Sequence, residues 1–243
     1  MYRNRPQKTQ KTNWLLDIGE RWRAALRRRR DGSDGAEPSK GLEAQFNNKY
    51  HFAGRADAIA CEAMRINSGI LGRRTFKVPQ DGLRPTMEQA REGIFSSLAA
   101  KIPGARVLDL FAGSGSLGLE AWSRGAARVT AVEKVSKLWK ILQENFQTLA
   151  GDPELGSWQA VQADVYDFLK RGAGPFDLIF ADPPYDEADL TKLCDALGGA
   201  LAPDGILVFE MRSRGAYSAP PNWNLIKEKI YGGTRMLFLE QVK

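Results

Sequence analysis

The strongest constraint on the fold is an alternation of short apolar runs with helical stretches from residue 106 onward. Five of these runs lack the polar alternation of a strand with one solvated face, which is typical of strands buried on both faces. They are RVLDLF (106–111), RVTAVE (128–133), WQAVQAD (158–164), FDLIFAD (176–182) and GILVFE (205–210). Strands that alternate with helices predict an α/β fold with a mostly parallel, doubly wound sheet and right-handed crossovers.

Further patterns complete this scheme. Near the C-terminus, WNLIKEKIY, Gly232-Gly233 and TRMLFLEQV predict two strands joined by a two-residue hairpin, which would add an antiparallel pair to the sheet. Upstream of the first run, Thr86 with Gln89 has the spacing of a capping box, so we expect a helix with Thr86 as its N-cap that ends before Pro103. The clearest helix between strands carries its apolar side chains on one side: Val135, Leu138, Trp139, Leu142, Phe146 and Leu149.

The first 63 residues differ from the rest of the chain. They hold 13 Lys/Arg against 8 Asp/Glu, whereas residues 64–243 are nearly balanced at 22 against 21. Residues 13–30 have the spacing of a short amphipathic helix, and residues 31–41 have the composition of a linker. We expect residues 1–63 to be a largely disordered extension, with Met64 as an alternative start; a transit peptide, a nucleic-acid arm or a membrane-surface helix is the alternative. Residues 64–243 would form one domain, with an N-terminal segment at 64–103 and a core at 104–243.

Composition excludes several classes of function. The two cysteines, Cys61 and Cys194, make neither a disulfide framework nor a metal cluster, and His51 is the only histidine, so we expect no metal site. No apolar run approaches the length of about 20 residues that a membrane span needs, and no secretory signal begins the chain. A cytoplasmic protein is expected.

The loop after the first apolar run carries the clearest binding motif. In DLFAGSGSLG, Gly113, Gly115 and Gly118 match G-x-G-x-x-G, and Glu133 ends the next run 20 residues after Gly113. Glycines let the backbone approach a ligand closely, and the following helix N-terminus offers free N–H groups to an anion. A carboxylate at Glu133 can accept hydrogen bonds from the hydroxyls of a ribose. The motif predicts a nucleotide-like cofactor.

Other acids at strand ends favour S-adenosylmethionine over NAD. Asp109 precedes the loop, where it could meet the ammonium group of a methionine moiety and would be poorly placed beside a pyrophosphate. Asp164, at the end of the third run, could accept from an adenine amino group. In open α/β sheets, ligands bind at the carboxyl ends of strands, so these side chains should meet at one edge.

The fourth run ends in Asp182-Pro183-Pro184-Tyr185. Two prolines hold Asp182 and Pro183 extended and rigid, and they leave carbonyl groups without competing N–H donors. The carboxylate of Asp182 and the carbonyl of Pro183 can accept both hydrogens of an exocyclic amine, which orients its lone pair toward a methyl group while Tyr185 stacks on the base. Positioning then supplies most of the catalysis.

The segment 64–106 holds 8 basic against 3 acidic side chains. Such a stretch beside a near-neutral core could bind phosphates, and Arg84 and Arg91 are candidates for RNA contact. An ordinary solvated face is the alternative for both arginines.

Together these motifs resemble the RsmD family, bacterial 16S ribosomal RNA guanine-N2 methyltransferases. The resemblance extends over residues 64–243 and is carried by MRINSGILGRRTFKVP, GLRPTMEQAREGIFSSL, VLDLFAGSGSLGLEAWSRGA, FDLIFADPPY and PPNWNLIKEKIYGG. It implies a seven-stranded class I methyltransferase fold, the cofactor S-adenosylmethionine, and 16S rRNA or the small ribosomal subunit as partner of a monomer. By motif, the resemblance implies that the cofactor is bound by Asp109, Phe111, Ala112, Gly113, Ser114, Gly115, Glu133 and Asp164. It implies that the target base is held by Asp182, Pro183, Pro184 and Tyr185. It further implies that the RNA is contacted by Arg73, Arg74, Arg84, Thr86 and Arg91.

Three alternatives remain open at the level of the residues. Adenine-N6 and protein glutamine-N5 methyltransferases use similar (D/N)-P-P-(Y/F) ends. The glycine motif alone also fits an NAD-dependent oxidoreductase. A non-catalytic RNA-binding assembly factor on the same fold is the third possibility.

Overall fold

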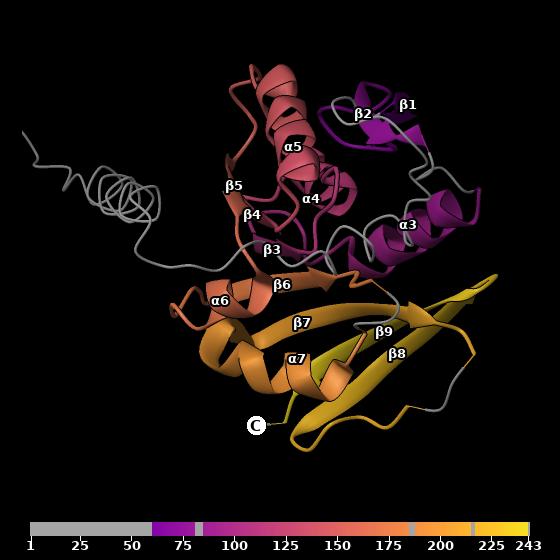
Figure 1. Ribbon diagram of the computed structural model, residues 1–243, viewed down its shortest axis with the longest axis vertical. Coiled ribbons are helices and arrows are strands. Elements are labelled where there is room, and N and C mark those ends of the chain that lie inside the picture. The colour runs from indigo at the N-terminus through magenta and orange to yellow at the C-terminus, as the bar shows by residue number, and fades with distance from the viewer. Residues whose placement is uncertain (1–59, 81–84, 185–187, 215–216, 243) are drawn as a thin grey trace, which may run out of the picture. The chain divides into compact units, whose positions relative to one another are not determined.

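The computed structural model describes residues 60–80, 85–184, 188–214 and 217–242 (Figure 1). The extension predicted for residues 1–63 lies mostly outside the described residues. Strand β1 (Cys61–Arg65) begins three residues before the predicted domain boundary and pairs antiparallel with β2 (Thr75–Pro79). The boundary drawn before Met64 therefore falls within a paired strand. Within the described residues, no helix is both long and apolar enough to cross a bilayer.

The core is a seven-stranded sheet in the order β5-β4-β3-β6-β7-β9-β8. The strands β3 to β7 are parallel to one another, and β9 pairs antiparallel with both β7 and β8, which confirms the predicted parallel sheet with a C-terminal antiparallel hairpin. The bounds are β3 (Arg106–Leu110), β4 (Arg128–Glu133), β5 (Ser157–Gln162), β6 (Phe176–Ala181), β7 (Leu201–Arg212), β8 (Trp223–Tyr231) and β9 (Thr234–Gln241).

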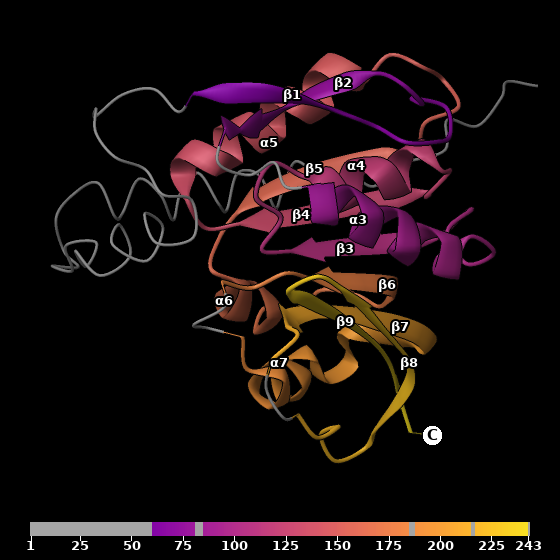
Figure 2. The same ribbon diagram turned by 90° about the vertical axis from the view of Figure 1, so that its right-hand side faces the viewer.

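Helices cover both faces of this sheet (Figures 1 and 2). Side chains of α3 (Pro85–Leu98), α4 (Ser116–Ser123) and α5 (Ser136–Leu149) pack in one apolar cluster with one face of the sheet. Side chains of α6 (Val165–Leu169) and α7 (Leu190–Leu197), which the short 3-10 helix Gly198–Ala200 follows, pack in a second cluster on the other face. This two-sided burial explains why the central strands are apolar without alternation.

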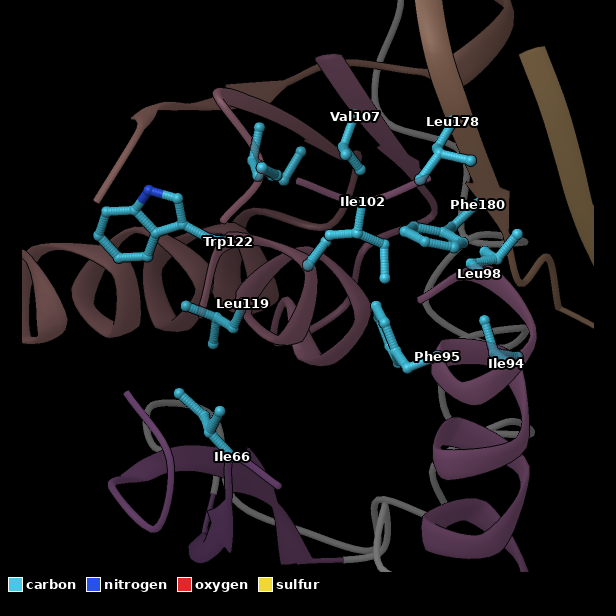
Figure 3. Close-up of a cluster of buried hydrophobic side chains, with 14 of the residues drawn as sticks. Ile66, Ile94, Phe95, Leu98, Ile102, Val107, Leu119, Trp122, Leu178 and Phe180 are labelled. Atoms are coloured by element: carbon cyan, nitrogen blue, oxygen red, sulfur yellow. The ribbon is translucent and has the colours of Figure 1, made fainter. Parts of the chain in front are cut away.

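The first cluster joins the N-terminal segment to the core (Figure 3). Ile66 of the loop after β1 is 1% exposed, and Phe95 of α3 packs on Phe180 of β6 with ring centroids 5.6 Å apart. Because aromatic side chains of this size bury a large apolar area, α3 is fixed over the carboxyl half of β6. Residues 64–98 are thus part of the folded domain.

Three local expectations are corrected. Helix α3 begins at Pro85, which is well suited to the first helical turn, so Thr86 lies inside the helix and is not its N-cap. Strand β7 begins at Leu201 and not at Gly205, the predicted start. A register shift between β7 and β6 near Phe176–Leu178 lets the strand extend past Pro203. Strand β5 ends at Gln162, two residues before Asp164.

Candidate active site

The predicted site residues follow neighbouring parallel strands. Leu110, at the end of β3, pairs with Val132 of β4 and with Ala181 of β6. The glycine loop after Leu110, the acid Glu133 and the acid Asp182 therefore leave the sheet at the same edge. This is the edge at which ligands bind in open α/β folds.

The glycine loop has a backbone that side chains rarely adopt. Phe111, Gly113 and Gly115 have φ values of 57°, 58° and 89°. The φ of Gly115 favours glycine, and a Cβ atom added there would lie 2.5 Å from Cδ1 of Leu142, which would have to move. The loop closes with a 2.8 Å hydrogen bond from the Gly115 N–H to the Ala112 carbonyl. Helix α4 follows the loop directly, as the motif predicts.

Glu133 is buried at 6% exposure, and both of its oxygens accept hydrogen bonds from the backbone. Its Oε2 accepts from the Gly113 N–H at 2.8 Å, and its Oε1 accepts from the Val135 N–H at 2.7 Å. The side chain therefore holds the glycine loop against the start of α5. Each carboxylate oxygen can accept further bonds, so its role toward a ribose stays a prediction.

Asp109 lies on β3 beneath the loop and is 2% exposed. Its Oδ2 accepts a 2.8 Å hydrogen bond from the Gly118 N–H in the first turn of α4. The pKa of Asp109 is raised to about 7, chiefly by burial; the charges of Asp182 and Glu133 contribute to the rise, and the bond from Gly118 opposes it. Contact between Asp109 and an ammonium group stays a prediction.

Asp164 is the N-cap of α6. Its Oδ1 accepts from the Tyr166 N–H at 2.9 Å, and its Oδ2 forms a 2.9 Å ion pair with Lys134. Burial raises the pKa of Asp164, but the Lys134 ammonium and the two capping N–H groups outweigh burial and hold this pKa below its usual range. The side chain is thus fixed at the sheet edge, where its role toward adenine remains a prediction.

Asp182 and Pro183 follow β6 directly, and Asp182 lines a pocket between α3 and the sheet. The other lining residues come from the N-terminal segment, α3, the start of α4, β7 and β9: Met64, Ala90, Arg91, Ile94, Ser116, Leu117, Glu210, Thr234 and Met236. Pro183 is buried and Pro184 half-buried, while Tyr185 lies outside the described residues. The pocket therefore lies next to α4, the helix that follows the glycine loop, and next to Asp182, the first residue of the D-P-P motif (Asp182-Pro183-Pro184).

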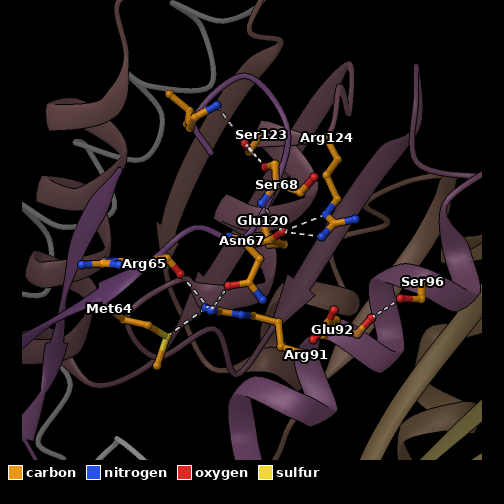
Figure 4. A network of polar contacts seen from close by, with 11 residues as sticks. Met64, Arg65, Asn67, Ser68, Arg91, Glu92, Ser96, Glu120, Ser123 and Arg124 are labelled. Carbon is orange, nitrogen blue, oxygen red and sulfur yellow. Dashed lines mark hydrogen bonds and ion pairs between the residues drawn. The ribbon is translucent and has the colours of Figure 1, made fainter. Parts of the chain in front are cut away.

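The structure assigns Arg91 to the interior (Figure 4). Arg91 is 4% exposed and its two terminal nitrogens donate to three groups of the segment 64–67: Met64 Sδ at 2.8 Å, the Arg65 carbonyl at 2.8 Å and Asn67 Oδ1 at 3.0 Å. The placement argues against the predicted contact with the RNA backbone, since a guanidinium held this way is not offered to a phosphate. It ties α3 to the N-terminal segment.

Arg73 and Arg74 lie in the turn between β1 and β2, and both are exposed. The turn is closed by 2.9 Å bonds from the Arg73 N–H to the Ile66 carbonyl and from the Ile66 N–H to the Arg74 carbonyl. Both side chains are accessible to RNA. Arg84 lies outside the described residues, as does the side chain of Thr86.

Three buried or half-buried polar residues escaped the sequence analysis. Glu120 of α4 is 1% exposed and accepts from the Asn67 and Ser68 N–H groups and from Arg124 (Figure 4). Asn145 of α5 bonds both Lys77 of β2 and the Ser114 carbonyl of the glycine loop. Glu210 lines the pocket of Asp182. An acid or amide within an apolar stretch was the only signal for any of them.

Comparison with known proteins agrees with this geometry. Residues 64–240 match the family described as conserved hypothetical protein 95. The chain is 36% identical over 173 residues to the ribosomal RNA small subunit methyltransferase D of Escherichia coli strain K12, and the alignment covers 70% of this chain and 85% of that protein. The protein of the same name from Haemophilus influenzae is 35% identical over 176 residues, with 70% and 89% covered. The chain belongs to this family, the RsmD family of methyltransferases.

The solved structure of the Escherichia coli protein yhhF extends the agreement to the fold. It is 34% identical and superimposes with a TM-score of 0.66, which covers 74% of this chain and 99% of that chain. This chain has the fold of S-adenosylmethionine-dependent methyltransferases, and its seven-stranded sheet and strand order agree with that fold.

Proposed function

We propose that this chain transfers a methyl group from S-adenosylmethionine to the exocyclic N2 amine of a guanine in 16S rRNA. The observation that carries the proposal is the position of Asp182 and Pro183: they follow β6 at the edge where the glycine loop leaves β3, and Asp182 lines a pocket there. Two relatives are named as small-subunit ribosomal RNA methyltransferases, which supports small-subunit rRNA as the substrate.

The residues at the sheet edge fit the cofactor. The glycine loop, which comprises Phe111, Ala112, Gly113, Ser114 and Gly115, has positive φ values at three of these residues and leads directly into the first turn of α4. Around it stand three carboxylates: Glu133 for the ribose hydroxyls, Asp164 for the adenine amine and Asp109 for the ammonium group. When bound, the cofactor supplies an electrophilic methyl group on a sulfonium.

The chain's own contribution is to hold and orient the attacking amine. Asp182 and the Pro183 carbonyl accept its two hydrogens, which leaves the nitrogen lone pair directed at the methyl group. The new N–C bond forms as the C–S bond breaks, and the nitrogen then loses a proton to the Asp182 carboxylate or through it to water. Tyr185, by its place in the motif, would stack on the base.

The remainder of the substrate is recognised outside the pocket. Arg73 and Arg74 present two exposed cations on the β1–β2 turn, and Arg84 precedes α3 in the sequence. Phosphate contacts of this kind position an RNA without reading its sequence. We propose that the chain acts as a monomer in the cytoplasm, on the small subunit or its rRNA.

The test is a map of 16S rRNA methylation with and without the protein. Deletion of the gene should remove one N2-methylguanine, and purified protein with S-adenosylmethionine should restore it. Loss of a methylated adenine, or an unchanged rRNA, would overturn the proposal. Calorimetry should show binding of S-adenosylmethionine and none of NAD.

Asp182→Ala should lower kcat at least about 100-fold, as expected for loss of a group that positions the reacting amine. The matched control is Asp177→Ala, at the other end of the same strand, where the half-exposed carboxylate pairs with Arg106. Undiminished methylation by Asp182→Ala would refute the catalytic assignment.

A further inference from the structure

Glu210 of β7 stands beside Asp182 at the carboxyl edge of the sheet. The last register pair of β6 and β7 is Ala181 with Phe209, so Asp182 and Glu210 are the next residues on neighbouring parallel strands. Such neighbours lie about 4.8 Å apart along the hydrogen-bonding direction. The two carboxylates therefore leave the sheet side by side.

Both side chains point to the face of the sheet that α3 covers. Ala181 and Phe209 pack in the cluster with α6 and α7, whereas Phe180 and Val208 pack in the cluster with α3 and α4. Successive side chains of a strand alternate between faces, so Asp182 and Glu210 project toward α3. The pocket confirms this, since Asp182 and Glu210 line it together with Arg91 and Ile94 of α3.

Arg91 of α3 also lines this pocket. Arg91 is 4% exposed, and its Nε–H has no hydrogen-bond partner within the described part of the chain. Buried donors nearly always have a partner, in the protein or in ordered water. The pocket is thus lined by two carboxylates and by an arginine whose terminal nitrogens are held by residues 64–67.

We infer that Glu210 selects guanine by accepting the hydrogen bond of its N1–H. This rests on the proposed function. The Watson–Crick edge of guanine presents, in sequence, the N2 amine, the N1–H donor and the O6 acceptor. Asp182 and Pro183 take the amine, and Glu210 takes the neighbouring N1–H.

Adenine is rejected by the same arrangement. Its N1 has no hydrogen and carries a lone pair, so a carboxylate at Glu210 would face a lone pair and remain without a donor. A polar group left unpaired in this way is strongly discriminating, whereas shape alone is not. The D-P-P motif, which suits any exocyclic amine, thereby gains a base preference from the next strand.

The test replaces the mapped target guanine with 2-aminopurine, by ligation into 16S rRNA that is then assembled into small subunits. 2-Aminopurine keeps the N2 amine but has an acceptor at N1. The wild-type full chain should favour guanine by roughly 100-fold in kcat/KM. Glu210→Gln offers an amide donor to N1, so this preference should fall at least about 10-fold, mainly through lower activity on guanine.

Two further variants keep the inference falsifiable. Glu210→Asp retains the charge and should retain the preference at a reduced rate, while Glu240→Gln, toward the other end of β9, should match wild type in both rate and preference. Thermal unfolding and calorimetric binding of S-adenosylmethionine should be unchanged in all three variants. An unchanged preference in Glu210→Gln, with guanine still methylated by wild type, overturns the inference alone. Absence of guanine methylation by wild type overturns the proposed function instead.

Discussion

The backbone N–H of Gly113 donates a 2.8 Å hydrogen bond to Oε2 of Glu133, a residue 20 positions later. Because Oε1 of the same side chain accepts from the Val135 N–H, one buried carboxylate fixes the glycine loop and the start of α5 together. The acid that the motif assigns to the cofactor is therefore also part of the loop's own framework. Replacement of Glu133 should therefore affect both cofactor binding and the order of the glycine loop.

Glu133→Gln keeps the shape of the side chain and removes its charge. An amide can accept only one of the two backbone bonds, so the loop should lose order and affinity for S-adenosylmethionine should fall about 10- to 100-fold, with a loss of about 1–3 kcal/mol in the free energy of unfolding. Calorimetric titration and urea denaturation measure the two effects. Affinity within twofold of wild type would refute the role of Glu133 in cofactor binding.

Asp109 should make stability depend on pH. Its pKa is about 7 in the folded chain, against an ordinary value of 3.8. Between these values the folded state binds more protons than the unfolded state, so the free energy of unfolding falls as pH rises. Asp109→Asn keeps an acceptor for Gly118 and should remove this slope: its stability relative to wild type should rise by roughly 2–3 kcal/mol from pH 5 to pH 8.

Urea denaturation at pH 5, 6, 7 and 8 gives this difference directly. The control is Asp177→Asn, because the pKa of Asp177 is held below its usual range, chiefly by Arg106, and it titrates below this window. A constant difference between Asp109→Asn and wild type over the window would show that Asp109 is ionised in the folded chain at pH 5.

Glu120 should be a main anchor of the N-terminal segment. It is 1% exposed and holds Arg124 and the N–H groups of Asn67 and Ser68. Glu120→Gln should lower the free energy of unfolding by about 2–4 kcal/mol, because it leaves a partly buried arginine and a backbone donor without a full partner. Hydrogen exchange of residues 66–74 should quicken.

The chain supplies a matched control for Glu120. Glu144 pairs with Lys77, but both side chains are about half exposed. Glu144→Gln should therefore change the free energy of unfolding by less than about 1 kcal/mol. Equal effects of the two substitutions would contradict the anchoring role.

Arg73 allows the RNA contact to be tested without harm to the fold. Its φ of 69° lies in the left-handed region, where glycine is free of the strain of about 1–2 kcal/mol that other residues carry. Arg73→Gly should therefore not lower the melting temperature, yet it should reduce kcat/KM on unmodified small subunits. The slope of the logarithm of RNA affinity against the logarithm of salt concentration should fall in magnitude by about 1. An unchanged salt dependence would show that Arg73 contacts no phosphate.

Much of the site could be predicted from sequence because it is local. The glycine loop and Glu133 belong to one strand–helix–strand unit, in which spacing along the chain fixes position in space. Asp182 directly follows β6, so its place at the sheet edge also needed only the strand assignment. Asp164 was placed at the correct edge, but it caps α6 instead of ending β5.

The roles of Arg91, Glu120 and Glu210 depended on the tertiary structure. Arg91 belongs to a basic stretch of sequence that predicted RNA contact. It is buried because α3 packs against residues 64–67, which are more than 20 positions away. Glu210 reads as the end of an apolar strand until the order β6-β7 puts it beside Asp182. By itself the sequence determined the parallel sheet, the glycine loop and the methyl-transfer motif, because periodicity and spacing act over a few residues. Which polar groups meet in the pocket was decided by the packing of distant elements, which no local pattern encodes.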